Sequence, residues 1–216
     1  MLDLYVDSAV RDDVEPLLAL GAFKGVTTSP TILHRAGLTG ADLPGVYRWA
    51  AAAGAKEIFV QAWGDTVEDL VTSGQRLMEL GNLTVVKVAA TRNGIRAGAE
   101  LAKVGVPVLL TVVYAAHQAV TAAAIGAKYL APYIGKMADD GRPAREETAT
   151  MHRLLRATDS PTRVLAASVR NTADLVYLAE QGVDAFTLPV AVARKLFDDP
   201  STTTAAAGFD EITGGW

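Results

Sequence analysis

The sequence predicts an α/β protein, a single-domain (β/α)8 TIM barrel, and three observations support this fold class. Eight short apolar runs rich in β-branched residues alternate with longer segments rich in Ala and Leu. There is no glycine-rich dinucleotide fingerprint, which disfavours the alternative of a doubly wound open sheet. The length of 216 residues suits one domain, so we expect one barrel over residues 1–216, with a short tail after about residue 200.

The apolar runs are the predicted strands. They are residues 2–6, 23–27, 58–61, 83–88, 108–112, 128–131, 163–167 and 185–188. Runs such as Val-Val-Lys-Val lack a clean alternation of apolar and polar residues. This pattern is typical of parallel strands that helices cover, as in a barrel.

The segments between the runs have helical periodicity. Among them are residues 66–80, 95–104, 115–125, 145–157 and 172–181. Asp65 and Asn171 precede two of these helices as candidate N-caps. Glycines that suit a helix C-terminus follow four of them: Gly81, Gly105, Gly126 and Gly182. The tail over residues 205–216 ends in Gly-Gly-Trp, and we expect it to be helical only briefly.

The composition excludes several classes of function. A net charge of −4 argues against nonspecific binding to nucleic acid. The chain has no cysteine, which excludes disulfides, thiolate metal sites and a cysteine nucleophile. The acidic N-terminus does not fit a signal peptide, and no apolar run is long enough to cross a bilayer. We therefore expect a cytoplasmic protein without nucleic-acid or membrane partners.

The three histidines match no metal-ligand spacing. His34, His117 and His152 fall in different helical segments, and the sequence has neither an HExxH motif nor a carboxylate cluster. We expect no metal and no cofactor.

Polar residues end seven of the eight predicted strands. In a barrel the C-terminal ends of the strands meet at one face, where active sites are built. The residues at or just beyond these ends are Asp7, Thr27, Thr28, Ser29, Gln61, Lys87, Thr111, Tyr133, Ser168 and Arg170. The last strand ends in Leu188-Pro189, and we expect it to add no polar side chain.

Lys87 is the strongest single indication of chemistry, because it lies within a buried apolar strand. Burial disfavours the ammonium form and lowers the pKa of a lysine. A lysine that forms a Schiff base needs the free amine, and an apolar strand favours that form. The alternative is a structural lysine that pairs with a carboxylate or extends its ammonium to the mouth of the barrel.

Other strand-end residues are candidates for proton transfer and substrate binding. Asp7 could relay protons to Lys87 or cap the following helix, and Tyr133 could act as an acid–base or as a packing aromatic. Gln61 and Thr111 could hold a water or a substrate hydroxyl, or be satisfied by the backbone.

A phosphate site is the second candidate feature of this face. Ser168, Arg170 and Lys136 could together bind a phosphate, because arginine forks and amides at a helix start suit that group. For the two cations, solvated surface charge is the alternative.

Taken together, these residues resemble the short transaldolase and fructose-6-phosphate aldolase family of class I aldolases. The similarity extends along nearly the whole chain. Its motifs are Leu4-Tyr-Val-Asp7-Ser, Gly25-Val-Thr-Thr-Ser-Pro30-Thr-Ile, Phe59-Val-Gln61, Val85-Val-Lys87-Val, Thr111-Val-Val-Tyr114, Ala131-Pro-Tyr133, Leu165-Ala-Ala-Ser168 and Thr187-Leu-Pro189.

The resemblance implies a barrel enzyme that acts on sugar phosphates without a metal or cofactor. Lys87 would attack a ketose carbonyl, and the bond between the third and fourth carbons would break to leave a dihydroxyacetone unit on the lysine. Asp7 matches the catalytic aspartate, while Thr27 and Ser29 match positions that hold donor hydroxyls. Ser168 matches a phosphate-binding serine, and Lys136 and Arg170 would assist it.

Two positions distinguish the branches of the family. Transaldolases tend to carry Glu and Phe where this chain has Gln61 and Tyr133, so the resemblance favours an active site of the aldolase type. The alternatives are a transaldolase that transfers dihydroxyacetone to an aldose phosphate, including one specialised for a biosynthetic pathway, and a sugar-phosphate-binding barrel without turnover. The chain departs from the family pattern at Ser29, Ala89 and Lys136. The family also forms rings, so a homo-pentamer or decamer is implied.

Overall fold

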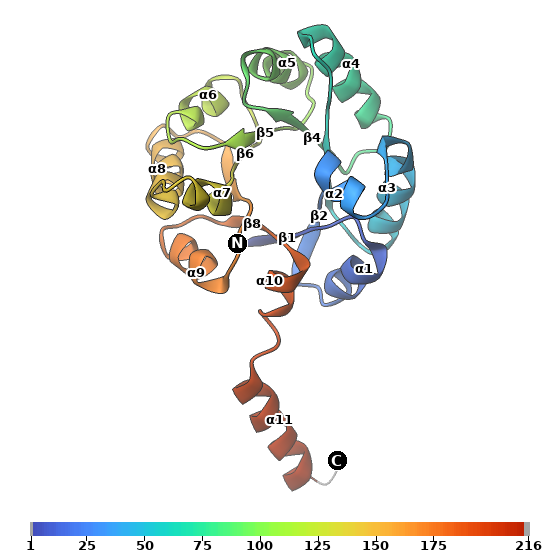
Figure 1. Cartoon of the computed structure of the whole chain (residues 1–216), viewed down its shortest axis with the longest axis vertical. Coiled ribbons are helices and arrows are strands. Elements are labelled where there is room, and N and C mark those ends of the chain that lie inside the picture. Colours follow the sequence, from blue (N-terminus) through green and yellow to red (C-terminus); the bar gives the residue numbers. More distant parts are fainter. Residues whose placement is uncertain (1, 214–216) are drawn as a thin grey trace.

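The protein is a closed barrel of eight parallel strands with helices around it (Figure 1). The structure, a computed structural model, describes residues 2–213, with side chains up to Phe209. Each strand pairs with the next one along the chain, and β8 pairs with β1 to close the barrel. The (β/α)8 prediction is therefore confirmed.

All eight predicted strands are present, and their bounds differ from the predicted ones by at most about one residue at either end. The strands are β1 (Asp3–Asp7), β2 (Phe23–Thr27), β3 (Glu57–Gln61), β4 (Thr84–Ala89), β5 (Val108–Val113), β6 (Tyr129–Pro132), β7 (Arg163–Ala166) and β8 (Ala185–Leu188).

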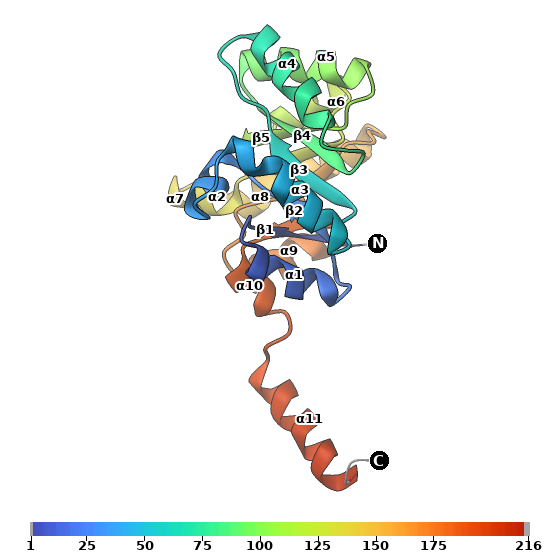
Figure 2. The ribbon, with the colours of Figure 1, turned by 90° about the vertical axis from the view of Figure 1, so that its right-hand side faces the viewer.

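Helices connect the strands and cover the outside of the barrel (Figure 1). They are α1 (Arg11–Ala19), α2 (Pro30–Arg35), the 3-10 helix η1 (Gly40–Asp42), α3 (Leu43–Ala52), α4 (Val67–Met78), α5 (Arg92–Lys103), α6 (Gln118–Ala124), α7 (Ile134–Asp139), α8 (Ala144–Ala157), α9 (Thr172–Glu180), α10 (Val190–Arg194) and α11 (Pro200–Thr213). Two of them, α2 and α7, lie at the same end of the barrel and on opposite sides of its mouth (Figures 1 and 2).

The helix caps agree with the sequence in all but one place. The side chain of Asn171 accepts from the amide of Asp174 at 2.8 Å and caps α9 as predicted. The prediction that Asp65 caps α4 is wrong, because Thr66 is the cap. Its hydroxyl accepts from the Asp69 amide at 3.1 Å, and the Asp69 carboxylate accepts from the Thr66 amide at 3.1 Å. This reciprocal pair satisfies two amides that a helix start leaves free.

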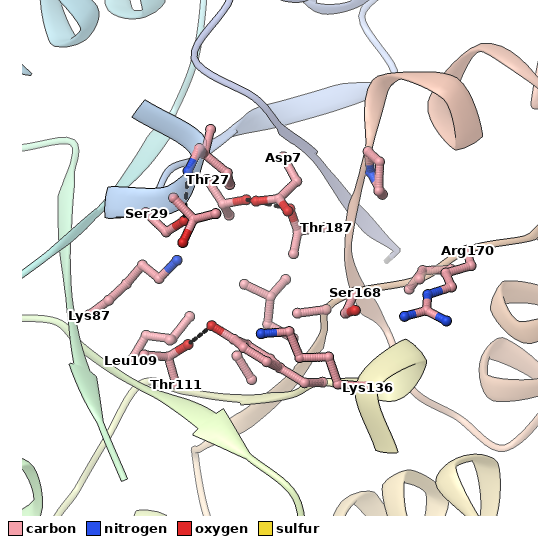
Figure 3. Close-up of a pocket in the computed structure, with 18 of the residues that line it drawn as sticks. Asp7, Thr27, Ser29, Lys87, Leu109, Thr111, Lys136, Ser168, Arg170 and Thr187 are labelled. Carbon is pink, nitrogen blue, oxygen red and sulfur yellow. Dashed lines mark hydrogen bonds between the residues drawn. The ribbon is translucent and has the colours of Figure 1, made fainter. Parts of the chain in front are cut away.

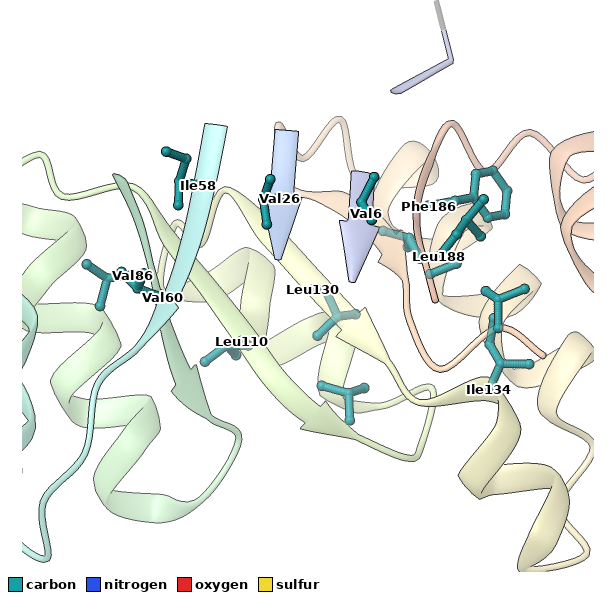
Figure 4. Close-up of a cluster of buried hydrophobic side chains, with 14 of the residues drawn as sticks. Val6, Val26, Ile58, Val60, Val86, Leu110, Leu130, Ile134, Phe186 and Leu188 are labelled. Atoms are coloured by element: carbon teal, nitrogen blue, oxygen red, sulfur yellow. The ribbon is translucent and has the colours of Figure 1, made fainter. Parts of the chain in front are cut away.

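The hydrophobic core has two layers, because side chains alternate between the two faces of each strand. Tyr5 and Phe59 belong to a cluster inside the barrel. Their neighbours Val6 and Val60 belong to the larger cluster between the strands and the helices, part of which is drawn in Figure 4. The inner layer fills the barrel below its mouth, so the open space lies at the mouth itself.

The C-terminal segment differs from its prediction. It forms α11 over Pro200–Thr213, which is longer than the brief helix expected, and this helix extends away from the barrel (Figures 1 and 2). The carboxylate of Asp199 accepts from the amides of Ser201 and Thr202 at 2.9 and 3.0 Å, while Pro200 occupies the first turn. An N-cap and a proline at this position start a helix, which the alanines that follow propagate. Within residues 2–213, the helices are too short or too polar to cross a membrane.

Candidate active site

A cavity of about 350 Å³ opens at the C-terminal ends of the strands (Figure 3). Of the ten predicted site residues, nine line it: Asp7, Thr27, Ser29, Lys87, Thr111, Tyr133, Lys136, Ser168 and Arg170. The tenth, Gln61, is not among its lining residues. Side chains from β1, β2, β4, β5 and the segments after β6 and β7 therefore meet in one space, as the topology of a barrel requires.

Lys87 lies on β4 with only 6% of its surface exposed, and its side chain extends into the cavity (Figure 3). Its Nζ donates to the carbonyl oxygen of Thr28 at 2.6 Å. Among the described residues, no carboxylate lies within 4.0 Å of this nitrogen. Lys87 therefore forms no salt bridge within the described part of the chain, contrary to the alternative of a structural lysine paired with a carboxylate. Burial lowers the pKa of Lys87, and the negative charge of Asp7 opposes this shift only in part.

Asp7 ends β1 and faces the cavity beside Thr27 (Figure 3). It does not cap α1, whose N-cap residue is Val10. The hydroxyl of Thr27 donates to Asp7 Oδ1 at 2.5 Å. Burial raises the pKa of Asp7, and the charge of Lys87, the Thr27 hydrogen bond and the charge of Arg35 counteract this without reversing it. The buried carboxyl group thus holds a proton more readily than an ordinary aspartate.

Tyr133 is the N-cap residue of α7, and its phenol shares a hydrogen bond of 2.9 Å with the hydroxyl of Thr111. Burial raises the pKa of Tyr133, the Thr111 hydrogen bond lowers it, and the charges of Asp7 and Tyr114 raise it further. The phenol is therefore protonated at neutral pH and available as a proton donor.

The strand that carries Thr111 bends where it reaches the cavity. The register between β5 and β6 shifts between Leu110 and Val113, and Val112 has a φ of 61°. The left-handed region is strained for a β-branched residue, and such strain is concentrated at functional sites. The bulge re-aims the end of β5 beside Thr111 and Tyr133.

The predicted phosphate-binding residues lie together across the cavity from Lys87 (Figure 3). Ser168 has a φ of 58°, so the loop after β7 is also strained at the cavity. The two guanidinium nitrogens of Arg170 donate to the two carboxylate oxygens of Asp139, one of them at 2.6 Å, which fixes its orientation and offsets its charge. Lys136 lies over the ring of Tyr133, with its nitrogen 5.1 Å from the ring centroid.

Gln61 lies at the end of β3, where its amide nitrogen donates to the carbonyl oxygens of Ala62 and Lys87 at 3.1 and 3.2 Å. The side chain is therefore bonded to the backbone of the strand that carries Lys87. The sequence left two interpretations of Gln61: that it holds a water or a substrate hydroxyl, or that the backbone satisfies its amide. The observed hydrogen bonds correspond to the second.

Three polar residues of the cavity, Thr187, Arg35 and Thr31, are absent from the site predicted from the sequence. The expectation that β8 adds no polar side chain is wrong, because Thr187 lines the cavity and its hydroxyl lies 2.5 Å from that of Thr27. Alternation along the strand would have found it, since Thr187 is one residue before the last and faces inward. Arg35 also lines the cavity, from the end of α2. It lies four residues after Thr31, and this i, i+4 spacing puts both on one helix face.

No group of three or more His, Asp or Glu side chains that could hold a metal ion occurs within the part of the chain that the structure describes. The polar groups of the cavity are instead one amine, one carboxyl group, one phenol, hydroxyls and three further cations.

Comparison with solved structures shows the barrel fold alone. A flavocytochrome b2 variant with sulfite bound has a TM-score of 0.61 at 14% identity, and the match covers 87% of this chain. A mandelate oxidase variant with 2-hydroxy-phenylacetamide has a TM-score of 0.62 at 16% identity over 88% of this chain. The chain spans 56% and 65% of the lengths of these two proteins.

Comparison of sequences identifies the family. A protein of Cytophaga hutchinsonii named as a probable transaldolase is 30% identical over 96% of each chain. Proteins of Thermus thermophilus and Methanococcus maripaludis with the same name are 29% and 28% identical, over 97% and 100% of this chain and 97% of each relative. The model of the family Transaldolase/Fructose-6-phosphate aldolase matches residues 4–214. The chain therefore belongs to the transaldolase/fructose-6-phosphate aldolase family of enzymes.

Proposed function

We propose that the protein cleaves or forms the bond between the third and fourth carbons of ketose phosphates through a Schiff base on Lys87. The observation that carries the proposal is the buried amine of Lys87, which faces the cavity without a carboxylate beside it in the described part of the chain. The lowered pKa of Lys87 raises the fraction of free amine, which is the nucleophilic form.

In the proposed reaction, Nζ of Lys87 forms a bond to the second carbon of the ketose. The carbinolamine oxygen takes a proton from the phenol of Tyr133 and leaves as water, which gives a protonated imine. The Asp7 carboxylate then takes the proton of the hydroxyl on the fourth carbon. The electrons of the broken carbon–carbon bond move to the imine, and the product aldehyde leaves. Lys87 keeps the three-carbon unit as an enamine until protonation and hydrolysis release dihydroxyacetone.

Substrate binding is proposed for the remaining cavity residues. Thr27 and Ser29 lie beside Lys87 and would bind the hydroxyls of the donor (Figure 3). Ser168, Lys136 and Arg170 lie across the cavity from Lys87 and would bind the phosphate of the substrate (Figure 3). Gln61 would help to position Lys87, because its amide donates a hydrogen bond to the Lys87 carbonyl oxygen.

The active-site type that we propose is that of the fructose-6-phosphate aldolases, because a phenol at Tyr133 and an uncharged amide at Gln61 are present. The second candidate is a transaldolase, which the names of the relatives favour. The two share the enamine and differ in its fate. Release of free dihydroxyacetone from fructose 6-phosphate supports the aldolase, whereas turnover only with erythrose 4-phosphate or ribose 5-phosphate supports the transaldolase.

Reductive trapping tests the covalent step. Borohydride added with fructose 6-phosphate should leave a three-carbon adduct on Lys87, read by mass spectrometry of peptides. The Lys87→Met variant should give none, while Lys103→Met, which changes an exposed lysine at the end of α5, should give as much as the wild type. Absence of the adduct on Lys87, together with ligand-dependent thermal stabilisation that is unchanged in Lys87→Met, would support a binding barrel without turnover instead.

We also propose a homo-oligomer, a pentamer or decamer by the family resemblance. Helix α11 extends from the barrel, and the side chain of Phe209 on it is 66% exposed (Figure 2). An exposed aromatic on a projecting helix suits packing against another subunit. Light scattering on the full chain and on a chain that ends before Pro200 should give a larger particle for the full chain only.

A further inference from the structure

The half-buried carboxylate of Asp7 is linked by a chain of hydrogen bonds to two buried hydroxyl groups. The Thr27 hydroxyl lies 2.5 Å from Asp7 Oδ1 and 2.5 Å from the hydroxyl of Thr187. Thr27 and Thr187 are 2% and 3% exposed. The three residues come from β2, β1 and β8, which are neighbours in the barrel, since β1 pairs with both of the other strands.

The direction of the chain follows from its number of protons. A hydroxyl has one proton to donate. Thr27 donates its proton to Asp7, so it must accept from Thr187 in the second contact. Thr187 has no other side-chain hydrogen-bond partner among the described residues, so its proton is free for this purpose. With Asp7 ionised, the order is therefore Thr187 to Thr27 to Asp7.

The same chain also fits the protonated carboxyl group. When Asp7 has taken a proton, it can donate to the Thr27 oxygen, and the Thr27 proton turns to the oxygen of Thr187. Both hydrogen bonds are kept with donor and acceptor exchanged, because a hydroxyl can both donate and accept. A backbone amide could donate to the carboxyl group but could not accept its proton. The two linked hydroxyls can therefore hold the carboxyl group in one position in both its protonated and its ionised form.

We propose that Thr187 is a positioning residue for Asp7. Its hydroxyl donates a hydrogen bond to Thr27, which keeps the Thr27 hydroxyl donating to the Asp7 carboxylate and so holds that carboxylate toward Lys87. The inference rests on the proposed role of Asp7 in proton transfer. The charged and titratable groups that act on Asp7 are Lys87 from β4, Arg35 from α2 and Tyr133 after β6. None of them is altered by a change at Thr187.

The test compares Thr187→Val with Thr187→Ser. Valine keeps the shape and removes the hydroxyl, whereas serine keeps the hydroxyl. With fructose 6-phosphate as substrate, we expect Thr187→Val to lower kcat about tenfold, as the loss of one buried hydrogen bond implies, with KM nearly unchanged. The acid limb of the pH profile of kcat should move to higher pH, because hydrogen bonds to a charged carboxylate are stronger than those of the neutral carboxyl group, so the ionised form of Asp7 loses more support. Thr187→Ser keeps the hydroxyl, so its kcat should stay within about twofold of wild type and its acid limb near the wild-type position.

A second pair of variants distinguishes the proposed effect through Thr27 from a nonspecific disturbance of the structure. If Thr187 acts through Thr27, adding Thr187→Val to a Thr27→Val enzyme should leave the acid limb where Thr27→Val alone puts it. Should Thr187→Val fail to fold, Thr187→Cys keeps a similar volume with only a weak donor and replaces it in both comparisons. An additive shift, or equal damage from serine and valine, overturns the proposal.

A titration without turnover separates this inference from the proposed reaction. The ¹³C carboxyl resonance of Asp7 should titrate at higher pH in Thr187→Val than in the wild type and Thr187→Ser. This result would stand even if no adduct formed on Lys87. An unchanged titration of Asp7 in Thr187→Val would overturn the positioning role, whatever the substrate of the enzyme.

Discussion

The amine of Lys87 donates to the backbone carbonyl of Thr28 at 2.6 Å, within a cavity that also holds the Asp7 carboxyl group. A carbonyl oxygen accepts from a free amine as well as from an ammonium, so this contact holds the nitrogen in place without demanding a charge. The strand fixes where the nitrogen points, and burial favours its neutral form.

Replacing Lys87 should separate catalysis from stability. Lys87→Met removes the nucleophile and the cost of burying an amine, so we expect kcat to fall at least ~10³-fold while the melting temperature stays the same or rises. Lys87→Arg should be equally inactive but less stable, because a guanidinium remains charged in the same buried place. Thermal melts of the three proteins beside their kcat values measure both effects. A melting temperature for Lys87→Met well below that of Lys87→Arg would contradict this account of the site.

Tyr133 should set the alkaline limit of activity. Burial raises its pKa above the ordinary value of 10.0, so the phenol loses its proton only at high pH. We expect Tyr133→Phe to lower kcat about 10²-fold and to abolish the alkaline fall in its pH profile. Thr111→Val, which removes only the hydrogen-bond partner of the phenol, should keep that fall and, since this bond lowers the pKa of Tyr133, move it to higher pH. An alkaline fall that persists in Tyr133→Phe would assign it to another group.

Much of this site follows from the sequence, because a lysine inside an apolar run and polar residues at strand ends are local signals. The strand of Lys87 and the position of Asp7 and Tyr133 at one face depend only on the order of strands. Thr187 is not the last residue of its strand but the one before it, and the alternation of side chains along a strand places this residue on the inward face.

Other features depend on contacts between distant segments, which a sequence without coordinates does not reveal. Arg35 reaches the cavity only because α2 lies beside the mouth of the barrel (Figure 2). The Gln61 amide donates to the carbonyl oxygens of Ala62 and of Lys87, which lies on the neighbouring strand. The left-handed backbone of Val112 contradicts the extended conformation that a valine in a strand run predicts. Tertiary contacts override local preference at each of these positions.

Arg35, at the end of α2, should influence the pKa of Asp7. Its positive charge lowers the pKa of Asp7 against the larger effect of burial. Arg35→Gln should therefore raise the pKa of Asp7 further and move the acid limb of the kcat profile to higher pH, whereas Arg35→Lys should leave the limb near its wild-type position. Because Arg35 is exposed, the difference between the two variants should shrink at ~1 M salt, where the Debye length is about 3 Å. A difference that salt does not change would indicate a direct structural role for the guanidinium.

Glu57 should stabilise the opposite end of the barrel in a way that depends on pH. It begins β3, is 7% exposed, and accepts from the phenols of Tyr5 and Tyr129 and from the ammonium of Lys128 at 2.6 Å. Lys24 also lies 3.2 Å from its carboxylate. Burial raises the pKa of Glu57, but the hydrogen bonds from Lys128 and Tyr5 and the charges of Lys128 and Lys24 together lower it below the ordinary value of 4.5.

A carboxylate with a lowered pKa in the folded state stabilises the protein above its unfolded pKa, and this contribution is lost as the pH falls through the folded value. We expect Glu57→Gln to lower the free energy of unfolding by roughly 1–3 kcal/mol at pH 7, since it leaves Lys128 and two phenols without a charged acceptor and Lys24 with Asp3 alone. The difference from wild type should shrink as the pH falls below about 4.5, where the wild-type carboxylate also takes up a proton. Urea denaturation of both proteins at pH 7 and at pH 4 measures this, and kcat at pH 7 should be unchanged, because the active site lies at the other end of the strands. A constant difference at the two pH values would show that Glu57 contributes through its shape and neutral hydrogen bonds rather than through its charge.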